Sequence, residues 1–214
     1  MIVFGPSLSP YVRKVLVFAA EKGLEVEQNT NTGGPNADPA FRAASPFGKI
    51  PAFTDGDFSI SDSTAIVSYL ERIKPEPSLV PSEARAHATA IWLEEFADDI
   101  LGGATVRIFF NRVVAKRMGR EPNLEAADKA EKDDLPKAFA YLETIVPESG
   151  FLVGDALSIA DIAVASPCVN LGHMNIGPDA ATYPKTAAYI ARILARPSFA
   201  KLIEAEKAFF AAAA

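Results

Sequence analysis

Three short segments in the N-terminal third of the chain carry residues that could together hold an anionic, peptide-like ligand. The first is Ser9-Pro10-Tyr11-Val12-Arg13-Lys14, the second is Gly48-Lys49-Ile50-Pro51, and the third is Asp62-Ser63. Ser9 and Asp62 are residue types that begin helices, and the backbone N–H groups of a helix start favour anions. A proline at the first residue of a strand leaves the neighbouring backbone open to a ligand. The segments form one site only if the fold brings them together.

Apolar periodicity and turn residues predict that these segments belong to a small α/β domain. The expected elements, in chain order, are a strand at residues 1–5, a helix from Pro10 to Gly23, a strand at 24–28, a helical turn around Phe41, a hairpin at 50–60 and a helix from about Ser61. Ser9 suits the N-cap of the first helix and Pro10 its first position. The order β-α-β-α-β-β-α predicts a mixed sheet with helices packed on it.

The rest of the chain has no strand pattern. Residues 75–82, which begin Pro75-Glu76-Pro77, are predicted to form a linker. Helices are then expected at 83–116, with a kink at Gly102-Gly103, at 124–146, from Ser158 onward, at 184–194 and at 199–210. The predicted organisation is an α/β domain at 1–74, a linker at 75–82 and an all-helical domain at 83–214.

Composition limits the chemistry that the chain can perform. Its 214 residues are 49% hydrophobic and 22% charged, and a net charge of −6 with interspersed acids and bases argues against nucleic acid or an anionic membrane as main partner. No apolar run approaches the roughly 20 residues that span a bilayer, and no signal peptide is recognisable. One cysteine, Cys168, and two histidines, His87 and His173, cannot build an ordinary structural zinc site. We therefore expect a soluble cytoplasmic protein that works without a metal.

Three motifs along the chain resemble those of one known family. They are Ser45-Pro46-Phe47-Gly48-Lys49-Ile50-Pro51, Asp62-Ser63-x-Ala65-Ile66, and Phe151-Leu152-Val153-Gly154-Asp155 followed by Ser158-x-x-Asp161. In this order they resemble the cytosolic glutathione S-transferase superfamily, as a serine-type bacterial member, over essentially the whole chain. The resemblance implies a thioredoxin-like domain that binds glutathione and a helical domain that forms most of an apolar pocket for a second substrate. It also implies a cytosolic homodimer.

The resemblance assigns the catalytic hydroxyl to Ser9. An unperturbed thiol has a pKa near ~8.5, and the thiolate is the nucleophile, so an enzyme that uses glutathione must stabilise its thiolate. A hydroxyl donor at a helix start can do this through a hydrogen bond and the helix dipole. Ser7 and Tyr11 are alternative donors, and Ser9 could instead simply cap the helix.

The resemblance also assigns the glutathione contacts. A cis Ile50–Pro51 bond would turn the backbone of Ile50 toward the cysteinyl part of glutathione, whereas the sequence pattern alone also allows a trans edge proline. Lys49 would meet the glycyl carboxylate, or be a solvated surface residue. Ser63 would bind the α-carboxylate and Asp62 the α-amino group, and helix capping is the alternative role. Many family members carry Glu or Gln where this chain has Asp62.

The second substrate is expected to meet residues of the long helix. Arg107, Phe109, Phe110 and Val114 lie where the family builds its electrophile pocket, and Arg107, Phe110 and Tyr11 are the candidate substrate-binding residues. Two phenylalanines at helical spacing are more often core residues than pocket residues, and one of this pair is expected to face the pocket.

The leading functional prediction is an enzyme that adds the glutathione thiolate to an apolar electrophile, or uses it to reduce an organic hydroperoxide. A glutathione-dependent thiol transferase would usually carry a cysteine at the helix start, where this chain has Ser9. An isomerase, dehalogenase or ether-cleaving enzyme is a further alternative, although the Ser-Ser-Cys run of the isomerases is missing here. The alternative from another class is a non-catalytic glutathione-binding or scaffold protein on the same fold.

Overall fold

The computed structural model describes residues 1–212, apart from the side chains of Phe209 and Ala212, so the end of the predicted helical domain lies outside the described residues. The described chain divides into two compact units. Unit 1 comprises Met1–Val80 together with the chain from Pro197 onward, and unit 2 is Pro81–Arg196. The last helix, expected in the helical domain, has contacts that group it with the N-terminal residues. The predicted boundaries at 74 and 82 stay a prediction.

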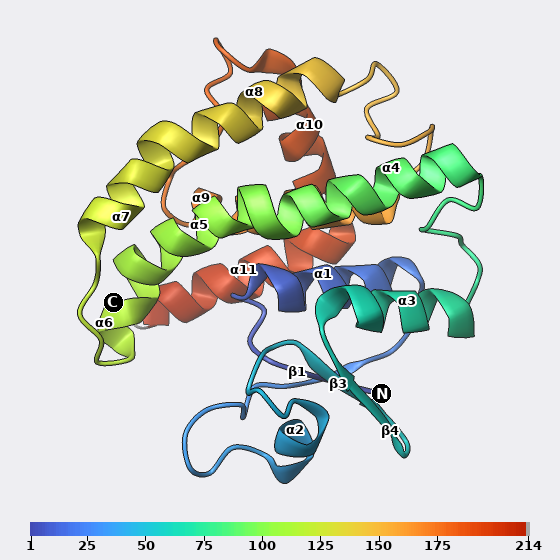
Figure 1. The fold of residues 1–214 in the computed structure, drawn as a ribbon, viewed down its shortest axis with the longest axis vertical. Helices are drawn as coiled ribbons and strands as arrows, with labels where there is room; N and C mark the ends of the chain where they lie inside the picture. The colour runs from blue at the N-terminus through green and yellow to red at the C-terminus, as the bar shows by residue number, and fades with distance from the viewer. Residues whose placement is uncertain (213–214) are drawn as a thin grey trace. The chain divides into compact units, whose positions relative to one another are not determined.

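Unit 1 contains the predicted mixed sheet. In the described residues the four strands follow the order β2-β1-β3-β4, with β2 parallel to β1 and the other pairs antiparallel. The strands are β1 (Ile2–Phe4), β2 (Glu27–Asn29), β3 (Ala52–Asp55) and β4 (Phe58–Ser61). Helices α1 (Pro10–Glu21) and α3 (Ser63–Ile73) lie on one side of the sheet and α2 (Pro39–Ala44) on the other (Figure 1). The predicted βαβαββα order, which is thioredoxin-like, is confirmed.

Local sequence signals set both ends of α1. The helix begins after Ser9 with Pro10 at its first position, where the missing proline N–H costs no hydrogen bond. Its last residue is Glu21, and Gly23, which follows the C-cap Lys22, has a φ of 63° in the left-handed region. The N–H of Gly23 donates to the carbonyl of Ala20 and that of Leu24 to the carbonyl of Ala19, both at 2.9 Å. This paired arrangement satisfies the last carbonyls of the helix and stops it just before Gly23.

A buried lysine holds the segment that follows α3. Lys22 is the C-cap of α1, and its ammonium group donates to Glu71 at 2.7 Å and to the carbonyls of Pro75 and Pro77 at 3.1 and 2.6 Å. The predicted linker therefore starts as a fixed segment of unit 1, because three oxygen atoms surround one buried cation.

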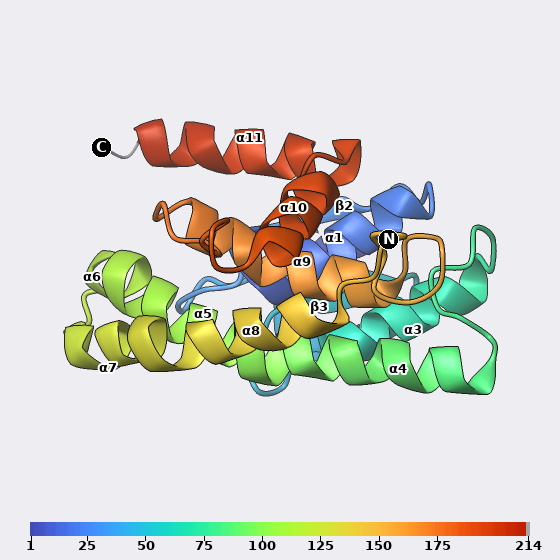
Figure 2. The same cartoon turned by 90° about the horizontal axis from the view of Figure 1, so that it is seen from above.

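Unit 2 consists of helices in the described residues (Figure 2). The helical stretch at 84–117 comprises α4 (Ala84–Glu95), η1 (Phe96–Leu101), α5 (Gly102–Phe109), η2 (Phe110–Val114) and α6 (Ala115–Arg117). Here η1 and η2 are π-helical turns. We expected a kink at Gly102-Gly103, but these residues are α-helical. The π-helical turns η1 and η2 lie before and after α5 instead. The sequence contains no proline there, and π-helical turns have no simple sequence signal.

The remaining helices of unit 2 include α9 (Ile159–Gly172), which is buried among the others. They are α7 (Leu124–Lys129), η3 (Ala130–Asp134), α8 (Leu135–Ile145), α9 and α10 (Pro184–Leu194), with η3 a third π-helical turn. Helix α9 is buried from Ile159 to Leu171 and contacts α4, α5 and α10 (Figure 2). Helix α11 (Pro197–Ala212) belongs to unit 1. Within residues 1–212, none of the helices combines the length and the apolar character that crossing a bilayer requires.

Candidate functional site

The strand register brings the three predicted segments to one end of the sheet in unit 1. Phe4 lies opposite Ala52, and Ala52 lies opposite Ser61 on its other side. The residues just after β1, just before β3 and just after β4 therefore meet at this end. These positions are the loop that leads into α1, the Ile50-Pro51 segment and the start of α3.

Gly5 joins two of these segments by close approach. A side-chain Cβ at Gly5 would lie 2.6 Å from Cγ2 of Val12 and 3.1 Å from Cβ of Ile50. Its φ of 130° is also one that residues with side chains rarely adopt. The first turn of α1 and the residue before Pro51 thus meet across a glycine that has no room for a larger residue.

A backbone hydrogen bond joins the second and third segments. The Ile50–Pro51 bond is cis, as the resemblance predicted. The carbonyl of Pro51 accepts a hydrogen bond from the N–H of Asp62 at 3.3 Å. In the preceding loop the Ser45 hydroxyl donates to the carbonyl of Lys49 at 2.7 Å, while the Lys49 side chain is exposed. A peptide-like ligand placed at Ile50 would therefore have a solvated ammonium group on one side and the start of α3 on the other.

Asp62 is held in an unusual backbone conformation at the start of α3. Its φ is 86° and its ψ 130°, values that are rare for a residue with a side chain and that cluster at functional sites. Oδ1 of Asp62 accepts hydrogen bonds from the N–H groups of Thr64 at 2.9 Å and Ala65 at 3.1 Å. Asp62 therefore does cap the helix. Within residues 1–212 its Oδ2 has no hydrogen bond, so one oxygen is left for a ligand. Ser63, the next residue, is buried.

Ser9 is the N-cap of α1 by position but not by its side chain. Its hydroxyl makes no capping hydrogen bond, whereas its N–H donates to the carbonyl of Pro6 at 3.0 Å and its carbonyl accepts from the N–H of Arg13 at 2.9 Å. The backbone holds the residue while the half-buried hydroxyl is not used in capping. Ser7 and Tyr11, the alternative donors, are also half-buried.

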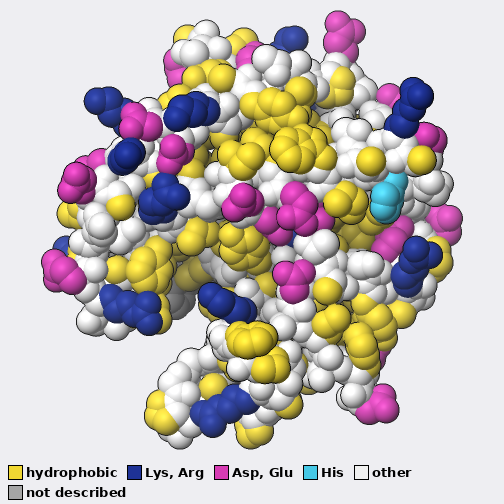
Figure 3. Space-filling model, viewed as in Figure 1, with side chains coloured by type: hydrophobic (Ala, Val, Ile, Leu, Met, Phe, Trp, Pro, Cys, Tyr) yellow, Lys and Arg dark blue, Asp and Glu magenta, His cyan; other side chains and the backbone are white. Residues whose placement is uncertain are grey.

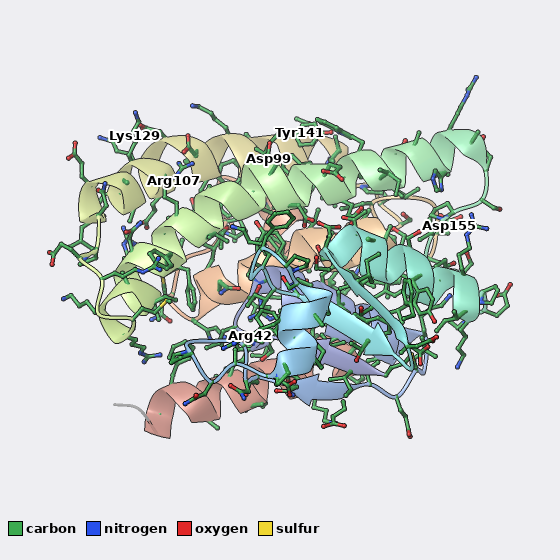
Figure 4. The ribbon with its side chains drawn as sticks, turned by 60° about the horizontal axis from the view of Figure 1, so that its bottom comes forward. Arg42, Asp99, Arg107, Lys129, Tyr141 and Asp155 are labelled. Atoms are coloured by element: carbon green, nitrogen blue, oxygen red, sulfur yellow. The ribbon has the colours of Figure 1, made fainter. Side chains whose placement is uncertain are left out.

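Of the candidate residues for the second substrate, Tyr11 belongs to unit 1, whereas Arg107 and Phe110 belong to unit 2. Arg107 extends from α5 (Figure 4). Its guanidinium group pairs with Asp134 at 2.8 Å. Phe109 is buried in the core of the unit. Phe110 is half-buried, with the guanidinium carbon of Arg120 at 5.9 Å from its ring centroid. Of the two phenylalanines, Phe110 is therefore the one with surface left to offer a ligand.

Sequence reasoning missed the role of Gly5. The close approach of Val12 and Ile50 to Gly5 depends on segments far apart in the chain. A glycine between an apolar strand and the start of a helix indicates in the sequence that another segment could approach closely. It does not indicate that Val12 and Ile50 are the residues that do so.

Comparison with known proteins agrees with this geometry. Residues 3–78 match the family described as glutathione S-transferase, N-terminal domain, and residues 110–206 match glutathione S-transferase, C-terminal domain. Glutathione S-transferase 3 of Zea mays is 30% identical over 208 residues, covering 95% of this chain and 93% of the maize protein. A glutathione S-transferase of Hyoscyamus muticus is 29% identical over 210 residues, covering 95% of this chain and 98% of its own length. Maleylacetoacetate isomerase of Rattus norvegicus is 27% identical over 205 residues, covering 91% of this chain and 90% of the rat protein.

Solved structures show the same relationship. The crystal structure of a glutathione S-transferase from Rhodospirillum rubrum F11 superposes with a TM-score of 0.83 at 27% identity, covering 94% of this chain and 90% of that one. Both domain families match in order, and the relatives are covered over nearly their full length. The chain therefore belongs to the glutathione S-transferase family of enzymes.

Proposed function

We propose that this protein activates the thiol of glutathione through Ser9 and directs the thiolate at an apolar electrophile. The observation that carries this proposal is the convergence, at one end of the sheet, of the start of α1, the cis-proline segment and the start of α3. A serine-type transferase that detoxifies electrophiles would need these parts together.

The proposed chemistry starts from the Ser9 hydroxyl. It donates a hydrogen bond to the sulfur of glutathione, beside the N–H groups that begin α1. Lowering the thiol pKa by one to two units corresponds to about 1.4–2.7 kcal/mol, which a charge-assisted hydrogen bond and a helix dipole can supply together. The sulfur then forms a bond to the electrophilic carbon, and the leaving group departs with the electron pair of the bond that breaks. The Ser9 hydroxyl makes no hydrogen bond that caps α1, which supports its assignment as the donor to the glutathione sulfur.

The remaining contacts of glutathione follow from the same geometry. The α-ammonium group pairs with Oδ2 of Asp62, and the α-carboxylate meets Ser63 at the start of α3. The backbone of Ile50 pairs with the cysteinyl residue, and the exposed ammonium of Lys49 meets the glycyl carboxylate. Each partner is a type that binds its group through charge or backbone hydrogen bonds.

For the second substrate we propose an apolar electrophile or an organic hydroperoxide. Phe110 offers part of an aromatic surface, and Tyr11 lies two residues beyond Ser9 in α1. Arg107 would contact an anionic part of a substrate only by exchanging its partner Asp134. Phe110 is therefore the stronger candidate in unit 2.

We also propose a cytoplasmic homodimer. Activation of a free thiol requires reduced glutathione, which reducing compartments maintain. Apolar side chains gather over α4 and α8 in unit 2 (Figure 3), where Trp92 is 51% exposed, and Ile100 in the adjoining η1 is 49% exposed. A second copy of the chain is the partner proposed for this surface, and sedimentation equilibrium tests it.

The proposed function is tested by binding glutathione in a calorimeter and then titrating the bound thiol by its ultraviolet absorbance. We expect binding and a thiol pKa below ~8.5. Ser9→Ala should return the pKa toward that value and lower kcat about tenfold or more, since one pKa unit is a factor of ten, while glutathione affinity changes little. Ser7→Ala is the matched control and should change neither. Binding without thiolate formation would point to a non-catalytic glutathione-binding protein, and the reverse result for the two serines would move the catalytic role to Ser7.

A further inference from the structure

Helix α11 runs antiparallel to α1 (Figure 1). Among the described residues, two contacts between polar side chains join these helices. The Ser198 hydroxyl donates to Oε1 of Glu21 at 2.6 Å. Arg13 donates through Nε to Oε1 of Glu206 at 3.2 Å and through Nη2 to Oε2 at 2.8 Å. Arg13 and Glu21 are eight positions apart in α1, and Ser198 and Glu206 are eight positions apart in α11. At 1.5 Å per residue both separations are about 12 Å, so the two helices stay in register along this length.

The two contacts lie at opposite ends of α1. Glu21 is the last residue of the helix, whereas Arg13 lies in its first turn and donates its N–H to the carbonyl of Ser9 at 2.9 Å. The Arg13–Glu206 contact is therefore one helical turn from the serine that the proposed function uses. The Ser198–Glu21 contact is two further turns away.

The Arg13–Glu206 pair is also the more rigid of the two contacts. Its side chains are 0% and 2% exposed, and the guanidinium group meets the carboxylate in a two-point arrangement. Such a fork fixes orientation as well as distance, and a buried charge of this kind is strongly destabilising when its partner is removed. The first turn of a helix is also the part that its own hydrogen bonds hold least well.

We propose that Glu206, acting through Arg13, is a positioning residue for Ser9. The ion pair holds the first turn of α1 so that the Ser9 hydroxyl and the neighbouring N–H groups face the sulfur of glutathione. This inference rests on the proposed function of Ser9. It makes the C-terminal helix, whose Glu206 is 193 residues beyond Arg13, a working part of the thiol site.

Charge and position predict opposite effects when Glu206 is removed. Without the carboxylate, the Arg13 guanidinium would be a less compensated cation one turn from the thiolate, and by charge alone it would lower the pKa of the bound thiol further. Loss of positioning would instead move the hydroxyl donor away from the sulfur and raise that pKa. The sign of the change therefore separates the two explanations.

The test is a titration of the bound glutathione thiol in Glu206→Ala, with Ser198→Ala as the matched control on the same pair of helices. Both variants are measured below their own melting temperatures. For Glu206→Ala we expect the thiol pKa to rise by about 0.5–1 unit, which lowers the thiolate fraction and kcat about threefold to tenfold at a pH below that pKa. Glutathione affinity should change less than twofold. Ser198→Ala should lower the melting temperature but leave the thiol pKa and kcat unchanged.

Three results would overturn the proposal. One is an unchanged or lowered thiol pKa in Glu206→Ala, and another is an equal rise in both variants, which would show general loosening of α11. If Glu206→Ala does not fold, Arg13→Lys keeps the charge pair without the two-point fork and should give a smaller rise of the same sign. No rise in the thiol pKa of Arg13→Lys would also count against positioning.

The wild-type protein is titrated first, so that failure of the two proposals can be told apart. If the wild-type protein forms no glutathione thiolate, the proposed function itself is wrong. If the wild-type protein lowers the thiol pKa and the variants lower it equally, only the role of Glu206 is wrong.

Discussion

The hydroxyl of Tyr189 in α10 donates a 2.9 Å hydrogen bond to Oδ1 of Asp161 in α9, inside unit 2. The same carboxylate accepts from the N–H of Leu152 at 2.8 Å and from the N–H and hydroxyl of Ser158 at 2.9 and 3.1 Å. Burial raises the pKa of Asp161, and these hydrogen bonds oppose that rise. One carboxylate thus connects α10, the start of α9 and the loop before it.

Removing this carboxylate should destabilise unit 2. In Asp161→Ala four buried donor groups lose their acceptor, namely the N–H groups of Leu152 and Ser158 and the hydroxyls of Ser158 and Tyr189. Each unsatisfied donor costs about 1–3 kcal/mol, but removing the buried carboxylate also removes the cost of its burial, so we expect the free energy of unfolding to fall by about 3–5 kcal/mol. Urea unfolding measures this, and Asp155→Ala, which removes an exposed acid in the same loop, should change it by less than about 0.5 kcal/mol. Equal effects of the two variants would contradict the role of Asp161.

The stability of the protein should also depend on Tyr189 at alkaline pH. Burial and the neighbouring Asp161 raise the pKa of Tyr189 well above 10, so the folded state favours the neutral phenol. The unfolded phenol ionises near ~10. The stabilisation is therefore complete below that pH and is lost as the pH rises above it, by up to about 1.4 kcal/mol per pH unit.

Tyr189→Phe isolates this effect because the other titrating groups are shared. At pH 7 the variant should be less stable by about 1 kcal/mol, owing to the lost hydrogen bond. Above pH 10 the difference from wild type should shrink and then reverse. Urea midpoints measured from pH 7 to 11 test this, and a difference that stays constant over the range would show that Tyr189 titrates normally.

Gly5 should be required both for folding and for glutathione binding. In Gly5→Ala the new Cβ would displace either Val12 or Ile50, since it would lie 2.6 and 3.1 Å from their atoms. We expect a loss of about 1–3 kcal/mol in stability from this overpacking. Calorimetry should show glutathione affinity weakened at least about tenfold, or ~1.4 kcal/mol. Gly33→Ala is the control, because nothing lies within 4 Å of its Cβ position. Normal glutathione affinity in a destabilised Gly5→Ala would mean that Val12 and Ile50 do not border one site.

Two substitutions of Asp62 separate capping from ligand binding. Asparagine caps helices about as well as aspartate, so Asp62→Asn should keep the stability within about 0.5 kcal/mol, whereas Asp62→Ala should lose about 0.5–2 kcal/mol. Loss of the negative charge should weaken glutathione binding in both variants, by about tenfold for a charge-assisted hydrogen bond. Calorimetry together with urea unfolding gives the two quantities. If Asp62→Asn binds glutathione as well as wild type does, Asp62 is only a helix cap.

The element order and most element ends of unit 1 could be predicted from sequence. Ser9-Pro10 and Gly23 bound α1, and Asp62 begins α3, because capping and turn formation depend on atoms within a few residues along the chain. Ser158 and Asp161 pair at the start of α9 over a similarly short distance along the chain. The three motifs that indicated the family were local as well, and the family comparison confirmed the family to which they pointed.

Only the tertiary structure decided how these local pieces meet. It placed Gly5 between Val12 and Ile50, gave Asp62 its positive φ, and buried Phe109 while leaving Phe110 half-buried. It also grouped α11 with the N-terminal unit through Arg13 and Glu206. Helix propensity and capping are written within a few neighbouring residues, so they can be read from the sequence. A contact between residues 193 positions apart depends on the path of the whole intervening chain, which no local pattern encodes.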